Sequence, residues 1–327
     1  MKIKQLTSFL IIICLLAGCA APQKSEKQAK KIKIGIMLSD VGLGDQSFSD
    51  AAFNGLSKAR DELGILFDYR ELKDSKTYEN GIEQLVKEGN DVVIGLGFAV
   101  QADLEKVAKK YPKQKFILVD SVSTLPNVTS ITFREDQGSF LAGALAALTS
   151  KSNKLGFIGG DDVELIHKFE NGFKQGARFI NPKIKVESVY AGDFGNDKLG
   201  AEIARKMIHN GTDVLYAAAG FTGVGVLRTA EEYDKYAIGV DSDQYFYAEK
   251  AVISSMQKNI DIALYQVAKN LVDHKGLQKG QIQLGLKENG IGLAPIRVIH
   301  LSDKDQQTLD SLKEKLSSEE IKTIINK

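Results

Sequence analysis

The chain has 327 residues, and its 43 Lys and Arg nearly balance its 42 Asp and Glu. A formal charge of +1 gives no electrostatic case for binding nucleic acid, whose phosphates require a basic surface. The only two cysteines are Cys14 and Cys19, so the chain beyond residue 19 can form neither a disulfide nor a thiol site.

The amino terminus predicts a bacterial lipoprotein. Two lysines precede the apolar stretch 6–16, which is too short for a membrane span, and small residues stand directly before Cys19. We therefore predict a signal peptide over 1–18, lipidation of Cys19, and a lysine-rich tether over 19–31. Lipid chains would hold the protein on the extracytoplasmic face of the cell membrane. A plain signal peptide that contains a cysteine by chance is the open alternative.

Beyond the tether, strand-like apolar runs alternate with amphipathic helical stretches, which predicts parallel sheets covered by helices. The expected strands are 32–38, 67–72, 92–96, 116–120, 128–133, 155–159, 186–190, 214–218, 237–240 and 251–256. The expected helices are 50–64, 78–88, 99–110, 138–148, 166–179, 198–209 and 222–233.

These two sets of strands predict an α/β fold of two similar, doubly wound parallel-sheet lobes, with a break near 133–138. The tail adds a helix, a pair of strands and one or two terminal helices, over 261–273, 279–299 and 303–326. Because the tail is too short for a third domain, we expect it to return and complete both lobes. The predicted lobes are 32–134 plus about 259–285, and 135–258 plus about 286–327. Several crossings would form a hinge, with the binding site in the cleft.

The stretch 41–55 leads from the first expected strand into its helix and holds the first candidate contacts. In an open α/β sheet, ligands bind at the carboxyl ends of the strands. Asp45, Ser47 and Phe48 would offer two polar groups and one aromatic ring there. The alternative interpretation is a helix cap with Phe48 in the core.

Other strand ends carry a similar set of side chains. The candidates there are Asp120, Phe194, Gly220, Asp241 and Lys258. Carboxylates accept hydrogen bonds from vicinal hydroxyls, and two aromatic rings can hold a planar base between them. The set therefore favours a ligand with a flat ring and several hydroxyls, while a capping or turn role stays open for each residue by itself.

These residues, together with Ile-Gly-Val-Asp-Ser-Asp-Gln at 238–244 and Ser-Met-Gln-Lys at 255–258, resemble the basic membrane protein family. Its members are substrate-binding lipoproteins of the purine nucleoside receptor type. The resemblance covers essentially the whole chain after the leader, and it implies a type I periplasmic-binding-protein fold. It also implies a purine nucleoside ligand that is delivered to an ABC permease.

Carried over one residue at a time, the resemblance implies a role for each candidate. Phe48 and Phe194 match the rings that stack on the base. Asp120 matches an acid at the base edge, with Asp45 nearby. Asp241 and Lys258 match the pair that binds the ribose, and Gly220 matches a backbone contact. Ser49 and Phe221 depart from residues that the family often shows at these positions.

The sequence offers no enzymatic centre. Its four histidines are not paired at metal-ligand spacing, and no Ser/His/Asp or Cys/His set occurs. We expect no enzyme activity, cofactor or metal, and a monomer that binds a purine nucleoside, an ABC permease and, through Cys19, the membrane. Two alternatives stay open, namely a sensory or regulatory lipoprotein of the same fold and a receptor for a sugar-like ligand.

Overall fold

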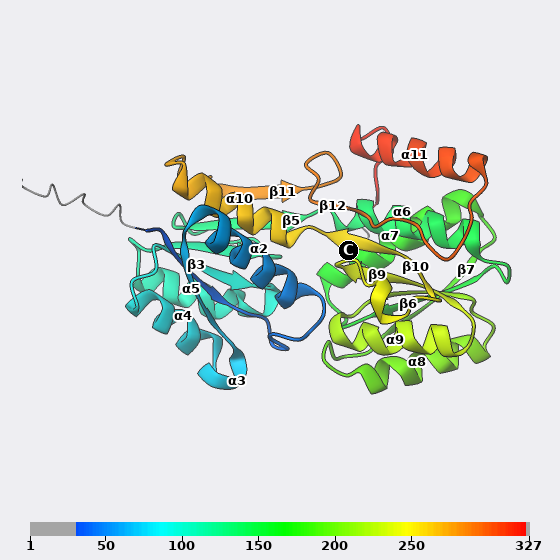
Figure 1. The fold of residues 1–327 in the computed structure, drawn as a ribbon, viewed down its shortest axis with the longest axis horizontal. Coiled ribbons are helices and arrows are strands. Elements are labelled where there is room, and N and C mark those ends of the chain that lie inside the picture. Colours follow the sequence, from blue (N-terminus) through cyan, green and yellow to red (C-terminus); the bar gives the residue numbers. More distant parts are fainter. Residues whose placement is uncertain (1–30, 325–327) are drawn as a thin grey trace, which may run out of the picture. The chain divides into compact units, whose positions relative to one another are not determined.

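The computed structural model describes residues 31–324, which build two six-stranded sheets covered by helices (Figure 1). The first sheet contains β1 (Lys33–Met37), β2 (Leu66–Arg70), β3 (Val92–Leu96), β4 (Lys115–Val119), β5 (Val128–Phe133) and β11 (Gly280–Leu284). The second contains β6 (Lys154–Gly159), β7 (Lys185–Tyr190), β8 (Val214–Ala218), β9 (Tyr236–Asp241), β10 (Val252–Lys258) and β12 (Ile291–Leu293). The prediction of two parallel-sheet lobes is confirmed, and in the described chain only β12 pairs antiparallel, with β10.

Both sheets have the same strand order. The first runs β11-β5-β4-β3-β1-β2 and the second β12-β10-β9-β8-β6-β7. The strands β4 and β9 therefore occupy matching places in the two lobes. Because parallel neighbours point the same way, the carboxyl ends of the strands gather at one edge of each sheet, where ligands bind in such folds.

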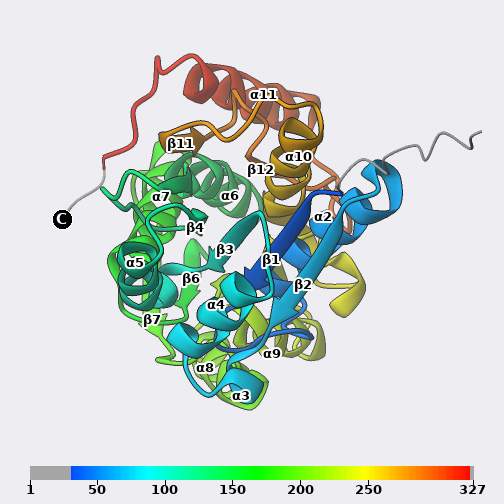
Figure 2. The ribbon, with the colours of Figure 1, turned by 90° about the vertical axis from the view of Figure 1, so that its left-hand side faces the viewer.

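Helices cover both faces of each sheet, because the strands direct apolar side chains to both faces. In the first lobe, α2 (Phe48–Leu63) and α10 (Ile260–Val272) cover one face, and α4 (Tyr78–Lys87) and α5 (Gln101–Lys110) cover the other (Figure 2). In the second lobe the corresponding pairs are α6 (Glu135–Thr149) with α7 (Glu164–Ile180), and α8 (Asp197–His209) with α9 (Gly220–Glu232). The shorter helices are α3 (Leu72–Ser75), η1 (Phe98–Val100) and η2 (Tyr245–Tyr247).

The chain passes three times between the sheets. It leaves β5 through Arg134 into α6, leaves β10 through Asn259 into α10, and runs from β11 to β12 through 285–290. The last helix, α11 (Asp303–Ser317), contacts α6 of the second lobe. The tail thus adds one strand to each sheet, as expected. The lobe boundaries themselves stay predictions, since the chain from Ile32 onward forms one compact unit.

Several element ends differ from the sequence expectation. Helix α6 begins at Glu135 rather than 138, because Glu135 and Asp136 favour the positive end of the helix dipole. Helix α11 ends at Ser317, well before 326, and Glu319 then takes a left-handed φ of 59°.

Two findings concern the predicted membrane anchor. The signal peptide, Cys19 and the tether up to residue 30 lie outside the described residues. Within 31–324, none of the helices has both the length and the apolar character needed to cross a bilayer.

Candidate functional site

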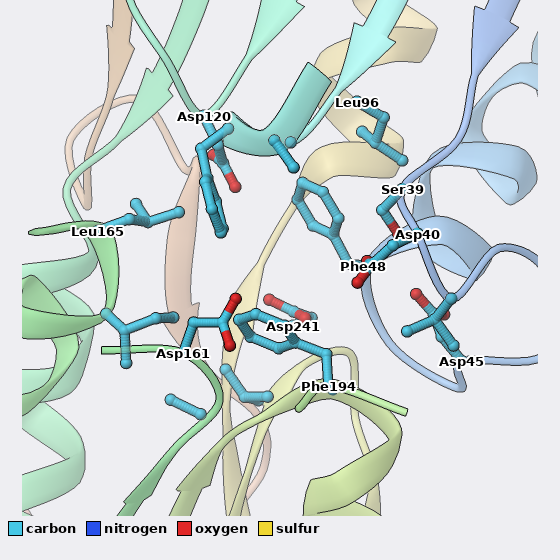
Figure 3. Close-up of a pocket in the computed structure, with 18 of the residues that line it drawn as sticks. Ser39, Asp40, Asp45, Phe48, Leu96, Asp120, Asp161, Leu165, Phe194 and Asp241 are labelled. Atoms are coloured by element: carbon cyan, nitrogen blue, oxygen red, sulfur yellow. The ribbon is translucent and has the colours of Figure 1, made fainter. Parts of the chain in front are cut away.

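A cavity of about 800 Å³, measured out to its mouth, lies between the strand ends of the two lobes (Figure 3). The structure brings seven of the eight predicted ligand-binding residues to its wall: Asp45, Phe48, Asp120, Phe194, Gly220, Asp241 and Lys258. The eighth, Ser47, lies behind the wall and donates its hydroxyl hydrogen to Asp241. Side chains that are far apart in the sequence therefore share one cavity, as the prediction requires.

The carboxylate of Asp45 holds the start of helix α2. It accepts hydrogen bonds from the backbone N–H groups of Ser47 at 3.0 Å, Ser49 at 2.6 Å and Asp50 at 3.1 Å. Burial raises the pKa of Asp45, and these three bonds oppose that rise. Since both oxygens are occupied by the backbone, Asp45 acts here as the cap of the loop, and a direct ligand contact by it stays a prediction.

Asp241 receives its hydrogen bond from the opposite lobe. The Ser47 hydroxyl donates to it from the β1–α2 loop, and next to this contact the Gln244 side chain donates to the Gln46 carbonyl at 3.2 Å. Burial raises the pKa of Asp241 to about 6, against the opposing effects of the Lys258 charge and the Ser47 bond. These contacts join the two lobes directly beside the cavity.

Lys258, which is 2% exposed, is surrounded by acids and aromatic rings. Its Nζ donates to Asp120 Oδ2 at 2.5 Å and lies 3.0 Å from Glu135 Oε1. It also lies within 6 Å of the ring centroids of Phe48, Phe133 and Phe169, at 5.3, 5.0 and 5.7 Å. Burial opposes the lysine charge, but the surrounding carboxylates outweigh it, so the pKa of Lys258 is raised. The lysine is therefore a fixed positive charge in the wall.

Asp120 presents one unused acceptor. Its Oδ2 receives the Lys258 hydrogen bond, whereas Oδ1 is buried and meets no hydrogen-bond donor of the described residues. The residue stands directly after β4 with a left-handed φ of 65°, as Asp241 does at the end of β9 with 64°. A buried carboxylate oxygen without a donor is costly unless a ligand or water supplies one. Asp120 is thus prepared to accept a hydrogen bond inside the cavity.

The two predicted aromatic residues both point into the cavity (Figure 3). Phe194 packs so closely over Gly160 that a Cβ atom there would lie 2.1 Å from the ring, so only glycine fits. A third ring, that of Phe98, lies 6.4 Å from Phe194 between centroids and is tilted by 57°. The cavity therefore offers several aromatic faces, as a planar ligand requires.

The charges around the cavity are mostly negative. Its wall contains five aspartates and a single lysine. Asp40 from the first lobe and Asp161 from the second were not predicted as site residues. The pKa of Asp161 is raised by burial and by the nearby charges of Asp40 and Asp193. Among residues 31–324, no group of three His, Cys, Asp or Glu side chains is arranged to hold a metal ion.

Comparison with known proteins identifies the family. The model of the family described as ABC transporter substrate-binding protein PnrA-like matches residues 31–327. The chain belongs to this family. Basic membrane protein D of Borreliella burgdorferi is 31% identical over 298 residues, which cover 89% of this chain and 86% of that protein. A protein of Pyrococcus abyssi that is named an uncharacterized lipoprotein is 34% identical over 301 residues, covering 86% and 74%.

A solved structure supports the same assignment. An ABC transporter solute-binding protein from Aeropyrum pernix K1 matches with a TM-score of 0.83 and 27% identity, over 90% of this chain and 94% of that one. The resemblance seen in the sequence is therefore confirmed, and the type I periplasmic-binding-protein fold with it. The PnrA-like family is one of substrate-binding proteins rather than enzymes.

Sequence reasoning missed several residues of this PnrA-like protein's site. Phe98 follows β3 and could have been found in the same way as Asp120, by looking for side chains directly after the carboxyl end of a strand. Phe169 lies on the apolar face of α7, where spacing cannot separate a cavity residue from a core residue. Glu135 lies within the segment taken as the break between the lobes, so its contact with Lys258 left no local signal.

Proposed function

We propose that this PnrA-like protein is the surface-anchored receptor of an ABC transporter and binds a purine nucleoside in the cavity between its lobes. The observation that carries the proposal is the unpaired Oδ1 of Asp120 in a cavity walled by aromatic rings. A planar purine base carries ring or amino N–H groups at its edge. Such a base fits between aromatic faces and gives Asp120 the missing donor.

The sugar would lie toward the second lobe. Asp241 stands at the end of β9, and its carboxylate can accept hydrogen bonds from vicinal ribose hydroxyls. Lys258 can donate to a ribose oxygen while it holds Asp120. The negative wall favours an uncharged nucleoside over its phosphorylated forms, because only one lysine faces five aspartates.

Ligand capture would use the hinge formed by the three crossings. The contacts of Ser47 with Asp241 and of Gln46 with Gln244 already join the lobes at the cavity. A nucleoside bonded to residues of both lobes adds to these contacts and stabilises the closed form. Lipidation of Cys19 would keep the receptor beside its permease, and the relatives' names, lipoprotein and membrane protein, support that placement.

A ligand panel tests this function. Purified protein is heated with adenosine, guanosine or inosine, and separately with free guanine, ribose, cytidine and guanosine monophosphate. A ligand at about a hundred times its Kd stabilises the folded state by about 2.7 kcal/mol, which a melting curve resolves easily. We expect the purine nucleosides to raise the melting temperature and ribose and the monophosphate to leave it unchanged. A rise with ribose alone would favour the sugar-like ligand, and no rise with any purine nucleoside would refute the proposal.

A further inference from the structure

Glu135 is a buried carboxylate that stands behind the cavity rather than in its wall. It is 1% exposed and begins helix α6, directly after the first crossing between the lobes. Its Oε1 lies 3.0 Å from Lys258 Nζ. No donor of the described residues meets either Oε1 or Oε2 with hydrogen-bond geometry, so the contact with Lys258 is an ion pair. The side chain therefore has one ionic partner, and that partner is the single lysine of the cavity wall.

This arrangement costs stability. The pKa of Glu135 is raised to about 7, because burial, helped by the neighbouring charge of Asp120, outweighs the opposing charge of Lys258. The other titratable groups that face the carboxylate are Tyr216 from β8 and the adjacent Arg134. Near neutral pH the folded chain thus holds a buried carboxylate whose two oxygens both lack a hydrogen-bond donor, and a neutral side chain of the same size would avoid burying that charge. Folding alone does not account for an acid at this position.

The geometry around Lys258 explains why an acid stands at position 135. An ammonium group has three N–H bonds. In this site one is donated to Asp120 Oδ2, and the charge of Glu135 attracts the ammonium from the side of the hinge. The ammonium then has an N–H to offer to the cavity, and Asp120 Oδ1 stays free for the ligand. Without the second anion, the ammonium would turn fully toward Asp120 and compete with the ligand for that carboxylate.

We propose that Glu135 is a positioning residue of the binding site, which holds the Lys258 ammonium from the hinge side and so fixes the donor and the acceptor offered to the ligand. This inference rests on the proposed nucleoside function. It adds a dependence on the charge of Glu135, because only the ionised carboxylate attracts the ammonium strongly. Affinity should therefore be higher when Glu135 is ionised than when it is protonated.

The test compares wild-type protein with Glu135→Gln, which keeps the size of the side chain and removes its charge. Calorimetric titrations use adenosine and guanosine at pH 6.5 and 8.0, where both nucleosides are essentially uncharged. If the ionised form binds about tenfold better, wild-type affinity rises about threefold between these pH values, because the ionised fraction rises through a pKa of about 7. Glu135→Gln should bind about tenfold more weakly at pH 8.0 and lose the threefold rise, keeping only the smaller change that comes from Asp241. Protonation of Asp241 is centred lower, at about 6, and contributes a smaller change over this interval.

Two matched variants separate positioning from folding. Glu170→Gln removes a carboxylate that is also paired with a lysine, Lys174, but lies outside the cavity wall, so its affinity and pH profile should equal those of the wild type. Glu135→Asp keeps the charge but withdraws it from Lys258, so it should bind more weakly and retain the rise with pH. At pH 8.0 the ligand-free Glu135→Gln protein should have a melting temperature equal to or higher than that of the wild type, since it loses a buried charge.

The outcomes are distinct. Wild-type affinity and pH profile in a folded Glu135→Gln protein would overturn the positioning role and leave the nucleoside function standing. If Glu135→Gln does not fold, Glu135→Asp decides, because unchanged binding by that variant would also overturn the role. Absence of binding by the wild type to either nucleoside would refute the proposed function, and this inference with it.

Discussion

Replacing Asp120 by asparagine tests whether the Asp120 carboxylate accepts a hydrogen bond from the ligand. The substitution keeps the size of the side chain and an oxygen that can accept from Lys258, but it removes the negative charge. A hydrogen bond to a charged acceptor contributes about 1.5–3 kcal/mol, and one between neutral groups about 0.5–1.5 kcal/mol. The difference, about 1–1.5 kcal/mol, corresponds to roughly tenfold weaker binding of guanosine.

The stability of Asp120→Asn should change little by comparison. Lys258 keeps Glu135 at 3.0 Å as an ionic partner and keeps the nearby charge of Asp241, so no unpaired charge is left buried. This distinguishes the variant from one that breaks a buried ion pair outright, which costs about 3–5 kcal/mol. The loss should therefore appear in ligand affinity and hardly at all in the melting temperature of the ligand-free protein.

The assay is calorimetric titration with guanosine at pH 7.5, together with melting curves without ligand. Asp213→Asn is the matched control. The Asp213 carboxylate accepts bonds from Ser150 and from the backbone of Lys151 and Ser152, and it lies outside the cavity. Unchanged guanosine affinity in Asp120→Asn would show that the ligand does not bond to Asp120. Loss of binding together with a fall of ten degrees or more in melting temperature would show that the residue serves folding instead.

Three further predictions follow from the same site. Asp241→Ala should weaken nucleoside binding by roughly tenfold to a hundredfold, since it removes charge-assisted bonds of about 1.5–3 kcal/mol, and equal affinity by calorimetry would remove Asp241 from the site. Wild-type affinity should decrease as the pH falls from 7 to 5, because two carboxylates lose their charge in this range. Burial raises the pKa of Asp241 to about 6, and its protonated form is a weaker acceptor, while Glu135, with a pKa of about 7, loses its hold on Lys258. A flat titration series over that range would contradict this. Phe194→Ala should weaken binding by roughly fivefold to a hundredfold, because base stacking contributes about 1–3 kcal/mol, whereas Phe246→Ala, at a side chain that is 75% exposed, should bind normally.

Much of the fold follows from local patterns in the sequence. The alternation of apolar runs and amphipathic stretches predicts the strands, and the shortage of chain after 258 predicts that the tail returns to both lobes. The strand-end rule brings Asp120, Phe194 and Asp241 into one cavity, because parallel strands must end at a common edge. These predictions depend on periodicity and connectivity, which a single sequence carries.

The ionic and hydrogen-bond partners of the site side chains could not be predicted in the same way. The resemblance implies that Asp241 and Lys258 both bind the ribose, and this stays a prediction. The sequence did not indicate which side chains hold them, and in the structure Lys258 is paired with Asp120 and Glu135, and Asp241 with Ser47. These partners lie more than a hundred residues from one another along the chain and meet only when the two sheets are placed together. Asp45 shows the opposite case, because the three amides that donate to it belong to residues two, four and five positions further along the chain. The capping alternative was therefore already visible in the sequence.

A crystal structure of the protein with guanosine would show directly which side chains hold the base and the ribose. We expect the base between the rings of Phe48 and Phe194, a base N–H donated to Asp120 Oδ1, and the ribose hydroxyls at Asp241 and Lys258. A nucleoside bound outside this cavity, or bound in it with Asp120 Oδ1 still lacking a donor from the base, would contradict the account.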